Sequence, residues 1–235
     1  MALSSFKLSI PLTSLQPSKD FKDDLVNATP KMINDFGDYF RAAAAGTNIP
    51  VQFLYAVAMV EETGTHYKPN GAVHVEGGAL RSTGIMQIDP AGFYEALKKE
   101  LPKSRLSAQS IAILQKYLPS LGLYNGMTLP GTPSAAVLNT IFLALKKPEF
   151  NIWAAAIDLR LFLESTANAD GTMRPDKAII KYNVGDYSAP TKLDVFLHGD
   201  TTSLVKSVNS ITSNYIVKVA GVNGAMDYFL KNKIA

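Results

Sequence analysis

The segment from residue 151 to residue 165 places the tightest constraint on the fold, because it is apolar on nearly every side of a helix. Its large apolar side chains and alanines are spread around all helical positions: Ile152, Trp153, Ala156, Ile157, Leu159, Leu161, Phe162 and Leu163. A helix with no broad polar face has to be covered by other elements. The sequence therefore predicts a domain built around this central helix.

Most of the remaining chain is also expected to be helical, because apolar residues recur at helical spacing between capping residues, prolines and glycines. We expect further helices at residues 31–45, 50–63, 90–100, 107–118, 134–146, 175–182, 201–219 and 223–231. Thr29-Pro30 and Asn48-Ile49-Pro50 are expected to open the first two of these, with Thr29 and Asn48 as N-caps, and Ser107 is expected to cap the fourth. A turn is expected at residues 168–171 and a loop at residues 185–199. Residues 1–28 lack a sustained period and are predicted to form an N-terminal arm, with residues 29–235 forming a single domain. The predicted fold class is mainly α.

Two glycine-rich stretches interrupt the helical pattern. Residues 67–84 combine glycines with alternating alanine and valine, which indicates a loop or a short irregular hairpin after the helix at 50–63. Residues 119–133 contain several prolines and glycines and are expected to form a surface loop. A small irregular or β element is therefore predicted within the helical domain.

Composition excludes several classes of function. With 23 basic and 20 acidic residues, the net charge of +3 is too small to indicate nucleic-acid binding, although it suits an anionic polymer such as a cell wall. The chain has no cysteine, which excludes disulfides and thiolate chemistry. Its three histidines are dispersed, without the spacing of a metal-binding helix, and no glycine-rich phosphate loop is present. No metal or cofactor is expected.

Two adjacent carboxylates, Glu61 and Glu62, end the helix expected at residues 50–63. Neighbouring helical residues point about 100° apart, so only one of them is expected to face a shared cleft. A carboxyl group beside an apolar wall has a raised pKa and can serve as a general acid near neutral pH. The alternative is that both are solvated residues at a helix end, although the helix dipole disfavours acids there.

A second strip, Gly84–Asp89, places polar groups among apolar residues. Gly84 allows the backbone to approach a ligand, and Gln87 supplies both a donor and an acceptor. The alternative for Gln87 is a core amide whose hydrogen bonds are satisfied within the fold. Asp89 stands directly before Pro90, so it is a candidate for a helix N-cap as well as for a site carboxylate.

A third cluster, Tyr182-Asn183, lies where a helix is expected to end. The tyrosine offers a hydroxyl and a stacking face to a sugar ring, and the asparagine offers an amide to an acetamido group or to the backbone. The alternative is an ordinary helix C-cap.

The order of these segments resembles that of the soluble lytic transglycosylases and goose-type lysozymes. The matching segments are Glu62–Gly64, Gly84–Ile88, Tyr182–Gly185 and Asn214–Val219. The family motifs run as Glu-Ser, Gly-Leu-Met-Gln, Ala-Tyr-Asn-x-Gly and a late Tyr-Val-x-x-Val. The resemblance covers roughly residues 48 to 220. It implies a lysozyme-like α+β fold and cleavage of the β-1,4 bond between N-acetylmuramic acid and N-acetylglucosamine in peptidoglycan.

Carried over residue by residue, the resemblance makes Glu62 the catalytic acid, because it directly precedes the hydroxyl residue of the first motif. That residue is Thr63 here, where the family usually has serine. Glu61 remains a rival for the role of acid. The residues that the resemblance assigns to the saccharide cleft are Thr63, Met86, Gln87, Tyr182 and Asn183, with Met86 as part of its wall.

Asp89 is the residue that decides which reaction the resemblance implies. In lytic transglycosylases of this family the muramoyl 6-hydroxyl attacks and leaves a 1,6-anhydro end, without a carboxylate nucleophile. In goose-type lysozymes an aspartate directly after the Met-Gln-apolar strip helps to place a water molecule, and Asp89 occupies that position. Glu76 and Asp186 are less favoured candidates. An inverting hydrolase needs its two carboxyl groups about 6.5–9.5 Å apart.

Two alternatives of other classes stay open. One is a non-catalytic glycan-binding or structural virion protein with a lysozyme-like fold. The other is an unrelated helical interaction domain, which a large distance between Glu62 and Gln87 would indicate.

The expected location and partners follow from the implied activity. The N-terminus lacks the pattern of a secretory signal, and no apolar run approaches the roughly 20 residues of a membrane span. A wall-cutting enzyme of this kind is expected to be made in the cytoplasm and to act as a bacteriophage endolysin or virion component. Its expected partners are peptidoglycan strands and, in a virion, other virion proteins, without nucleic acid or stable membrane insertion.

Overall fold

The computed structural model describes residues 15–63, 75–76, 79–80, 82–167, 173–184 and 210–234. Within these ranges, the side chains of residues 62–63, 75–76, 79–80, 176, 184 and 210–213 are not described. The described part is mainly helical, which confirms the predicted fold class.

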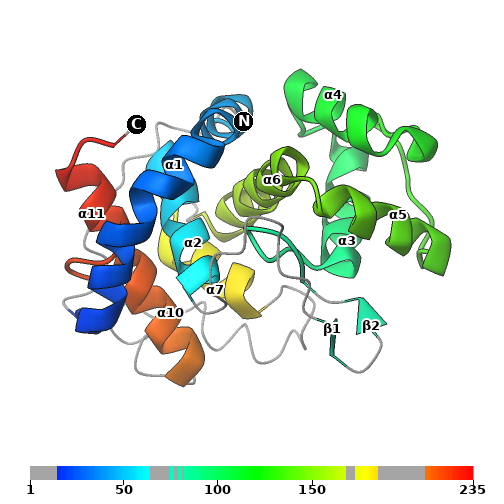
Figure 1. Cartoon of the computed structure of the whole chain (residues 1–235). Helices are drawn as coiled ribbons and strands as arrows, with labels where there is room; N and C mark the ends of the chain where they lie inside the picture. The colour runs from blue at the N-terminus through cyan, green and yellow to red at the C-terminus, as the bar shows by residue number, and fades with distance from the viewer. Residues whose placement is uncertain are drawn as a thin grey trace.

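The helices follow one another along the chain with few strands between them (Figure 1). The α-helices are α1 (Lys19–Thr47), α2 (Val51–Thr63), α3 (Pro90–Glu100), α4 (Ala108–Tyr117), α5 (Ala135–Leu145), α6 (Pro148–Thr166), α7 (Pro175–Val184), α10 (Ser210–Ala220) and α11 (Ala225–Lys231). The described residues also form two short 3-10 helices, η1 (Leu101–Lys103) and η2 (Pro119–Leu121). The strands are β1 (Val75–Glu76) and β2 (Ala79–Leu80).

Helix α6 occupies the centre of the molecule, as its apolar sequence predicts. Its buried residues run almost without interruption from Phe150 to Leu163. It contacts α1 and α7 on one side and α3, α4 and α5 on the other, and Figure 1 shows these helices gathered around it. The prediction of a central helix is confirmed, although α6 begins at Pro148, a few residues earlier than expected.

The start of α1 differs from the prediction. The Thr29-Pro30 pair was expected to open the helix, whereas α1 begins at Lys19, with the Ser18 hydroxyl accepting a hydrogen bond from the Phe21 amide. Pro30 lies inside the helix and cannot donate a backbone hydrogen bond. The preceding Thr29 turns its buried hydroxyl back to the Leu25 carbonyl at 2.5 Å. Residues 19–28, expected to belong to an N-terminal arm, form the first turns of α1.

Asn48 also has a different role from the expected one. The pattern Asn48-Ile49-Pro50 was expected to open a helix with Asn48 as its N-cap, but Asn48 closes α1 in a left-handed conformation with φ 55°. Its backbone N–H donates to the carbonyls at the end of α1. Asparagine tolerates this conformation better than most residues, which explains its use as a C-terminal cap. Helix α2 then begins at Val51, close to its expected start.

The starts of three other helices are as predicted. Asp89 accepts a hydrogen bond from the Gly92 amide at the start of α3. Ser107 and Ser134 make the equivalent hydrogen bonds at the starts of α4 and α5. A side chain that accepts from an unpaired amide of the first turn fixes where a helix begins, so these starts could be located from sequence.

The predicted small β element is the antiparallel pair β1 and β2, in which Val75 pairs with Leu80 and Glu76 with Ala79. The expected turn at residues 168–171 and loop at residues 185–199 lie outside the described residues, as does the start of the helix expected from residue 201. Over the part of the chain that the structure describes, no helix combines the length and the apolar character needed to cross a membrane.

Candidate functional site

The first part of the candidate site is the C-terminal end of α2. Residues 53–60 of this helix are all buried, and the half-buried Glu61 follows them. Its Oε1 accepts a hydrogen bond of 2.6 Å from the hydroxyl of Tyr215, a buried residue of α10. This contact joins Glu61, the residue directly before the first sequence motif, to the last motif, which contains Tyr215.

The Gly84–Ile88 strip folds into a tight turn that packs against the core. Thr83 and Ile88 face each other in an antiparallel bridge, with amide-to-carbonyl distances of 3.0 and 3.1 Å. Gly84 has φ +80° and Gln87 has φ 48°, so the turn uses two left-handed residues. Both the backbone amide and the side-chain Nε2 of Gln87 donate to the Gly84 carbonyl, at 3.1 and 2.8 Å.

Asn151 of α6 holds this turn from inside the molecule. It is fully buried, its Oδ1 accepts from the Met86 amide at 2.8 Å, and its Nδ2 donates to the Thr83 carbonyl at 2.8 Å. A buried amide has to find partners, and Asn151 finds them in the turn. The turn and α6 are thereby joined across more than sixty residues of sequence.

Tyr182 of α7 closes the turn from another side. Its hydroxyl donates to the Met86 carbonyl at 2.6 Å. Its ring meets that of Phe162 edge to face, with centroids 6.5 Å apart and planes at 81°. This contact joins the second and the third sequence motifs.

Charge and burial act in the same direction on the two tyrosines. Burial raises the pKa of Tyr215 well above its ordinary value, and the nearby charge of Glu61 and the hydrogen bond to it raise it further. Burial likewise raises the pKa of Tyr182, with additional contributions from the charges of Glu61 and of the buried Asp158. Both hydroxyls therefore remain protonated donors at neutral pH, and Glu61 lies within electrostatic reach of both.

The described residues of the predicted saccharide cleft differ in exposure. Gln87, Tyr182 and Asn183 are half-buried, whereas the side chain of Met86 is fully buried in the core. Only the main chain of Met86 takes part in the contacts above. The cleft wall predicted for its side chain is, in the described structure, a core contact.

The carboxylates of the predicted site are only partly described. The side chains of Glu62, Thr63 and Glu76 are outside the described set, and so is the whole of Asp186. Asp89 is half-buried and caps α3 through its Oδ2, which is 2.6 Å from the Gly92 nitrogen. The capping role of Asp89 is thus confirmed, and its role in placing water stays a prediction.

Sequence reasoning missed two residues of this region, Asn151 and Asp158. Both are buried polar residues in α6. Together with Phe162 they follow one another at intervals of seven and four residues, which places them on one face of the helix. Two polar residues on one face of an otherwise apolar helix were a readable signal that this face meets polar partners, but not of which partners.

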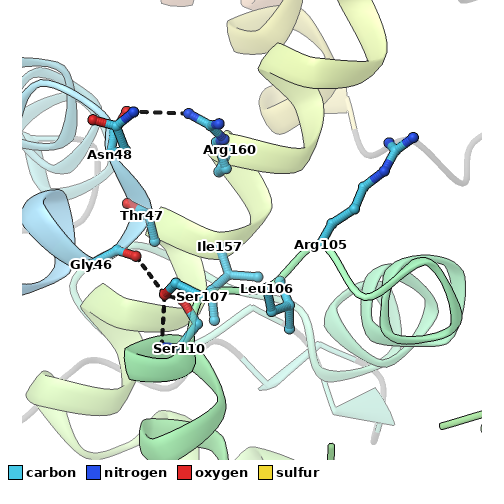
Figure 2. Close-up of a pocket in the computed structure, with 9 residues that line it drawn as sticks. All are labelled: Gly46, Thr47, Asn48, Arg105, Leu106, Ser107, Ser110, Ile157 and Arg160. Atoms are coloured by element: carbon cyan, nitrogen blue, oxygen red, sulfur yellow. Dashed lines mark hydrogen bonds between the residues drawn. The ribbon is translucent and has the colours of Figure 1, made fainter. Parts of the chain in front are cut away.

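The described structure also contains a pocket of about 180 Å³ elsewhere, between the end of α1, the start of α4 and α6 (Figure 2). It contains none of the motif residues. Ser107 donates to the Gly46 carbonyl at 2.6 Å, and Arg160 donates to the Asn48 carbonyl at 3.2 Å and pairs with Glu164. The bonds of Ser107 and Arg160 thus hold the end of α1 against α4 and α6.

Among the described residues, no three or more aspartate, glutamate or histidine side chains are grouped so that they would hold a metal ion.

No protein-family model, curated protein or solved structure matches this chain.

Proposed function

We propose that the protein has a lysozyme-like fold and cleaves the β-1,4 bond between N-acetylmuramic acid and N-acetylglucosamine in peptidoglycan. The observation that carries the proposal is that the second and third motifs contact each other, and that the fourth contacts Glu61, the residue directly before the first motif. Glu61 meets Tyr215 across 154 residues of sequence, and Tyr182 meets Met86 across 96. The charge of Glu61 also acts on Tyr182. Segments that resembled the family motifs by coincidence would have no reason to meet in space.

Glu62 is the proposed general acid, as the family resemblance implies. Protonation of the glycosidic oxygen requires a carboxyl group that carries a proton and is directed at the substrate. An oxygen of Glu61 already accepts the Tyr215 hydroxyl. Successive helical residues are rotated by about 100°, so the residue after Glu61 is expected to face a different neighbourhood. In this proposal Glu61 is a supporting residue of the site and Glu62 is the acid.

The proposed second step is attack by the muramoyl 6-hydroxyl. Its oxygen forms the new bond to the anomeric carbon as the bond to the glycosidic oxygen breaks. The leaving oxygen keeps the proton from Glu62, and the hydroxyl proton passes to the Glu62 carboxylate, which restores the acid. Asp89 favours this route, because one of its oxygens is already engaged in capping α3. Hydrolysis would require the same carboxylate to orient a water molecule on the far side of the sugar.

The test is lysis of isolated peptidoglycan by the wild type and by Glu62→Gln. Because a general acid contributes about 10²–10⁴-fold to a rate, we expect a loss of that order in the variant, with an unchanged melting temperature. Glu95→Gln is the matched control, because Glu95 is a partly exposed residue that pairs with Lys98 on α3. Full lysis by Glu62→Gln would remove the acid from the proposal, and binding of glycan strands without cleavage by the wild type would indicate a non-catalytic module.

A further inference from the structure

The turn at Gly84–Gln87 is bound to α6 through one side chain, that of Asn151. The amide of Asn151 presents its oxygen to the Met86 nitrogen and its nitrogen to the Thr83 carbonyl, both at 2.8 Å. An asparagine amide offers two donor hydrogens and one acceptor oxygen, so a single side chain holds two backbone groups of the turn at once. No apolar residue of similar size would do this.

Gly84 shows how closely the turn approaches that amide. A Cβ atom at Gly84 would lie 2.3 Å from Nδ2 of Asn151 and 2.4 Å from its Cγ. The absence of a side chain is thus what lets the backbone of the turn lie against the amide. Gly84 and Asn151 form a matched pair, one on the turn and the other on α6.

The conformation of Gln87 depends on this attachment. A left-handed backbone is unfavourable for a residue with a side chain and persists where the surroundings hold it. Three sets of hydrogen bonds hold the turn in this conformation. The Asn151 amide accepts from the Met86 N–H, the Tyr182 hydroxyl donates to the Met86 carbonyl, and Gln87 donates to the Gly84 carbonyl. Of these, Asn151 is the contact from the central helix.

We infer that Asn151 is a positioning residue for the proposed reaction, acting through the turn on Gln87. This inference rests on the proposed function, in which Gln87 contacts the saccharide. Asn151 is fully buried and does not itself touch the substrate. Its amide fixes the position of the turn on α6, and the position of the turn determines where the Gln87 side chain lies relative to the acid on α2.

A double-mutant cycle separates positioning from a general structural role. Displacement of a substrate-contacting group by about 1 Å can cost about 10²-fold in rate, so we expect Asn151→Ala to lower kcat/KM on soluble peptidoglycan fragments by roughly that factor. If Asn151 acts through Gln87, adding Asn151→Ala to Gln87→Ala lowers kcat/KM little further. Multiplicative losses in the double variant would overturn the inference, because residues that act independently are additive in free energy.

Leu114→Ala is the control for loss of core packing, since Leu114 is a fully buried residue of α4 whose side chain has no hydrogen-bonding group. At a temperature where every variant is folded, we expect it to retain kcat/KM within about threefold of the wild type, because the Leu114 side chain takes no part in the hydrogen bonds that hold the turn. Equal losses in Leu114→Ala and Asn151→Ala would overturn the inference.

Asn151→Ser is the second variant should Asn151→Ala not fold, because a hydroxyl keeps one donor and one acceptor at the same position. We expect an intermediate loss of kcat/KM that is likewise absent in the Gln87→Ala background; a loss that persists there contradicts positioning. A wild type that releases no fragments contradicts the proposed function, and with it this inference. An active wild type with an unaffected Asn151→Ala contradicts this inference alone.

Discussion

Gln87 has a backbone conformation that needs explaining, because a left-handed residue other than glycine costs about 1–2 kcal/mol. It has φ 48° in a turn whose carbonyl and amide groups are held by its own side chain, by Asn151 and by Tyr182. Such strain persists only where neighbouring contacts determine it, and it concentrates at functional sites. The sequence identified Gln87 as a candidate ligand for sugar, and the described structure adds that its backbone is under strain.

Gly84→Ala tests the close approach of this turn to α6. The new Cβ would meet the Asn151 amide at 2.3 Å and would also stand at φ +80°. A left-handed alanine costs about 1–2 kcal/mol, and overpacking a core adds about 1–3 kcal/mol. We expect a loss of roughly 2–5 kcal/mol in the free energy of unfolding, measured by urea denaturation.

Gly122→Ala is the matched control, because Gly122 has φ +56° and a Cβ added there would meet no atom within 4 Å. Gly122→Ala should therefore lower the free energy of unfolding only by the cost of a left-handed alanine, about 1–2 kcal/mol. Equal losses at the two glycines would mean that the contact between Gly84 and Asn151 is looser than described.

At the scale of elements, the starts of α3, α4 and α5 could be predicted because their capping side chains are local to the sequence. The start of α1 could not. Pro30 normally marks a helix end or start, but tertiary packing of Phe21 and Leu25 in the core carries the helix through it. A local signal was outweighed by burial. Asn48 illustrates the same limit, because an asparagine can serve either end of a helix.

The contact between α2 and α10 has a predicted dependence on pH. The pKa of Tyr215 is raised well above the ordinary value of 10.0 in the folded protein. Its contribution to stability is therefore fully present below about pH 10, where the unfolded tyrosine is also protonated, and is lost as the pH rises toward the folded pKa. Above pH 10 the unfolded state binds fewer protons, so the free energy of unfolding falls by up to about 1.4 kcal/mol per pH unit for this group.

Tyr215→Phe should lessen that alkaline decline and, at neutral pH, lower the free energy of unfolding by about 1.5–3 kcal/mol through the lost hydrogen bond to Glu61. Urea denaturation between pH 7 and 11 measures both effects. Tyr124→Phe is the control, because Tyr124 is 56% exposed. If the free energy of unfolding of the wild type fell no more steeply above pH 10 than that of Tyr215→Phe, the buried environment assigned to Tyr215 would be contradicted.

At the scale of the whole molecule, the candidate site forms where α2, α6, α7 and α10 meet (Figure 1). The motif residues and their order were visible in the sequence, and so was the central position of α6. The partners of those residues were not, because the contacts between Glu61 and Tyr215 and between Tyr182 and Met86 depend on how distant helices pack. Asn151 escaped prediction for the same reason, since nothing local indicates which backbone its amide meets.

The measurement that tests the proposed peptidoglycan cleavage most directly is mass spectrometry of the soluble products that the purified wild-type protein releases from isolated peptidoglycan. We predict disaccharide-peptides that end in 1,6-anhydro-N-acetylmuramic acid, each lighter by one water molecule than the corresponding hydrolysis product. Products with hydrolysed ends would still support cleavage of the β-1,4 bond, but they would indicate that Asp89 places a water molecule for hydrolysis. The absence of any released glycan fragment, from a folded protein, would contradict the account.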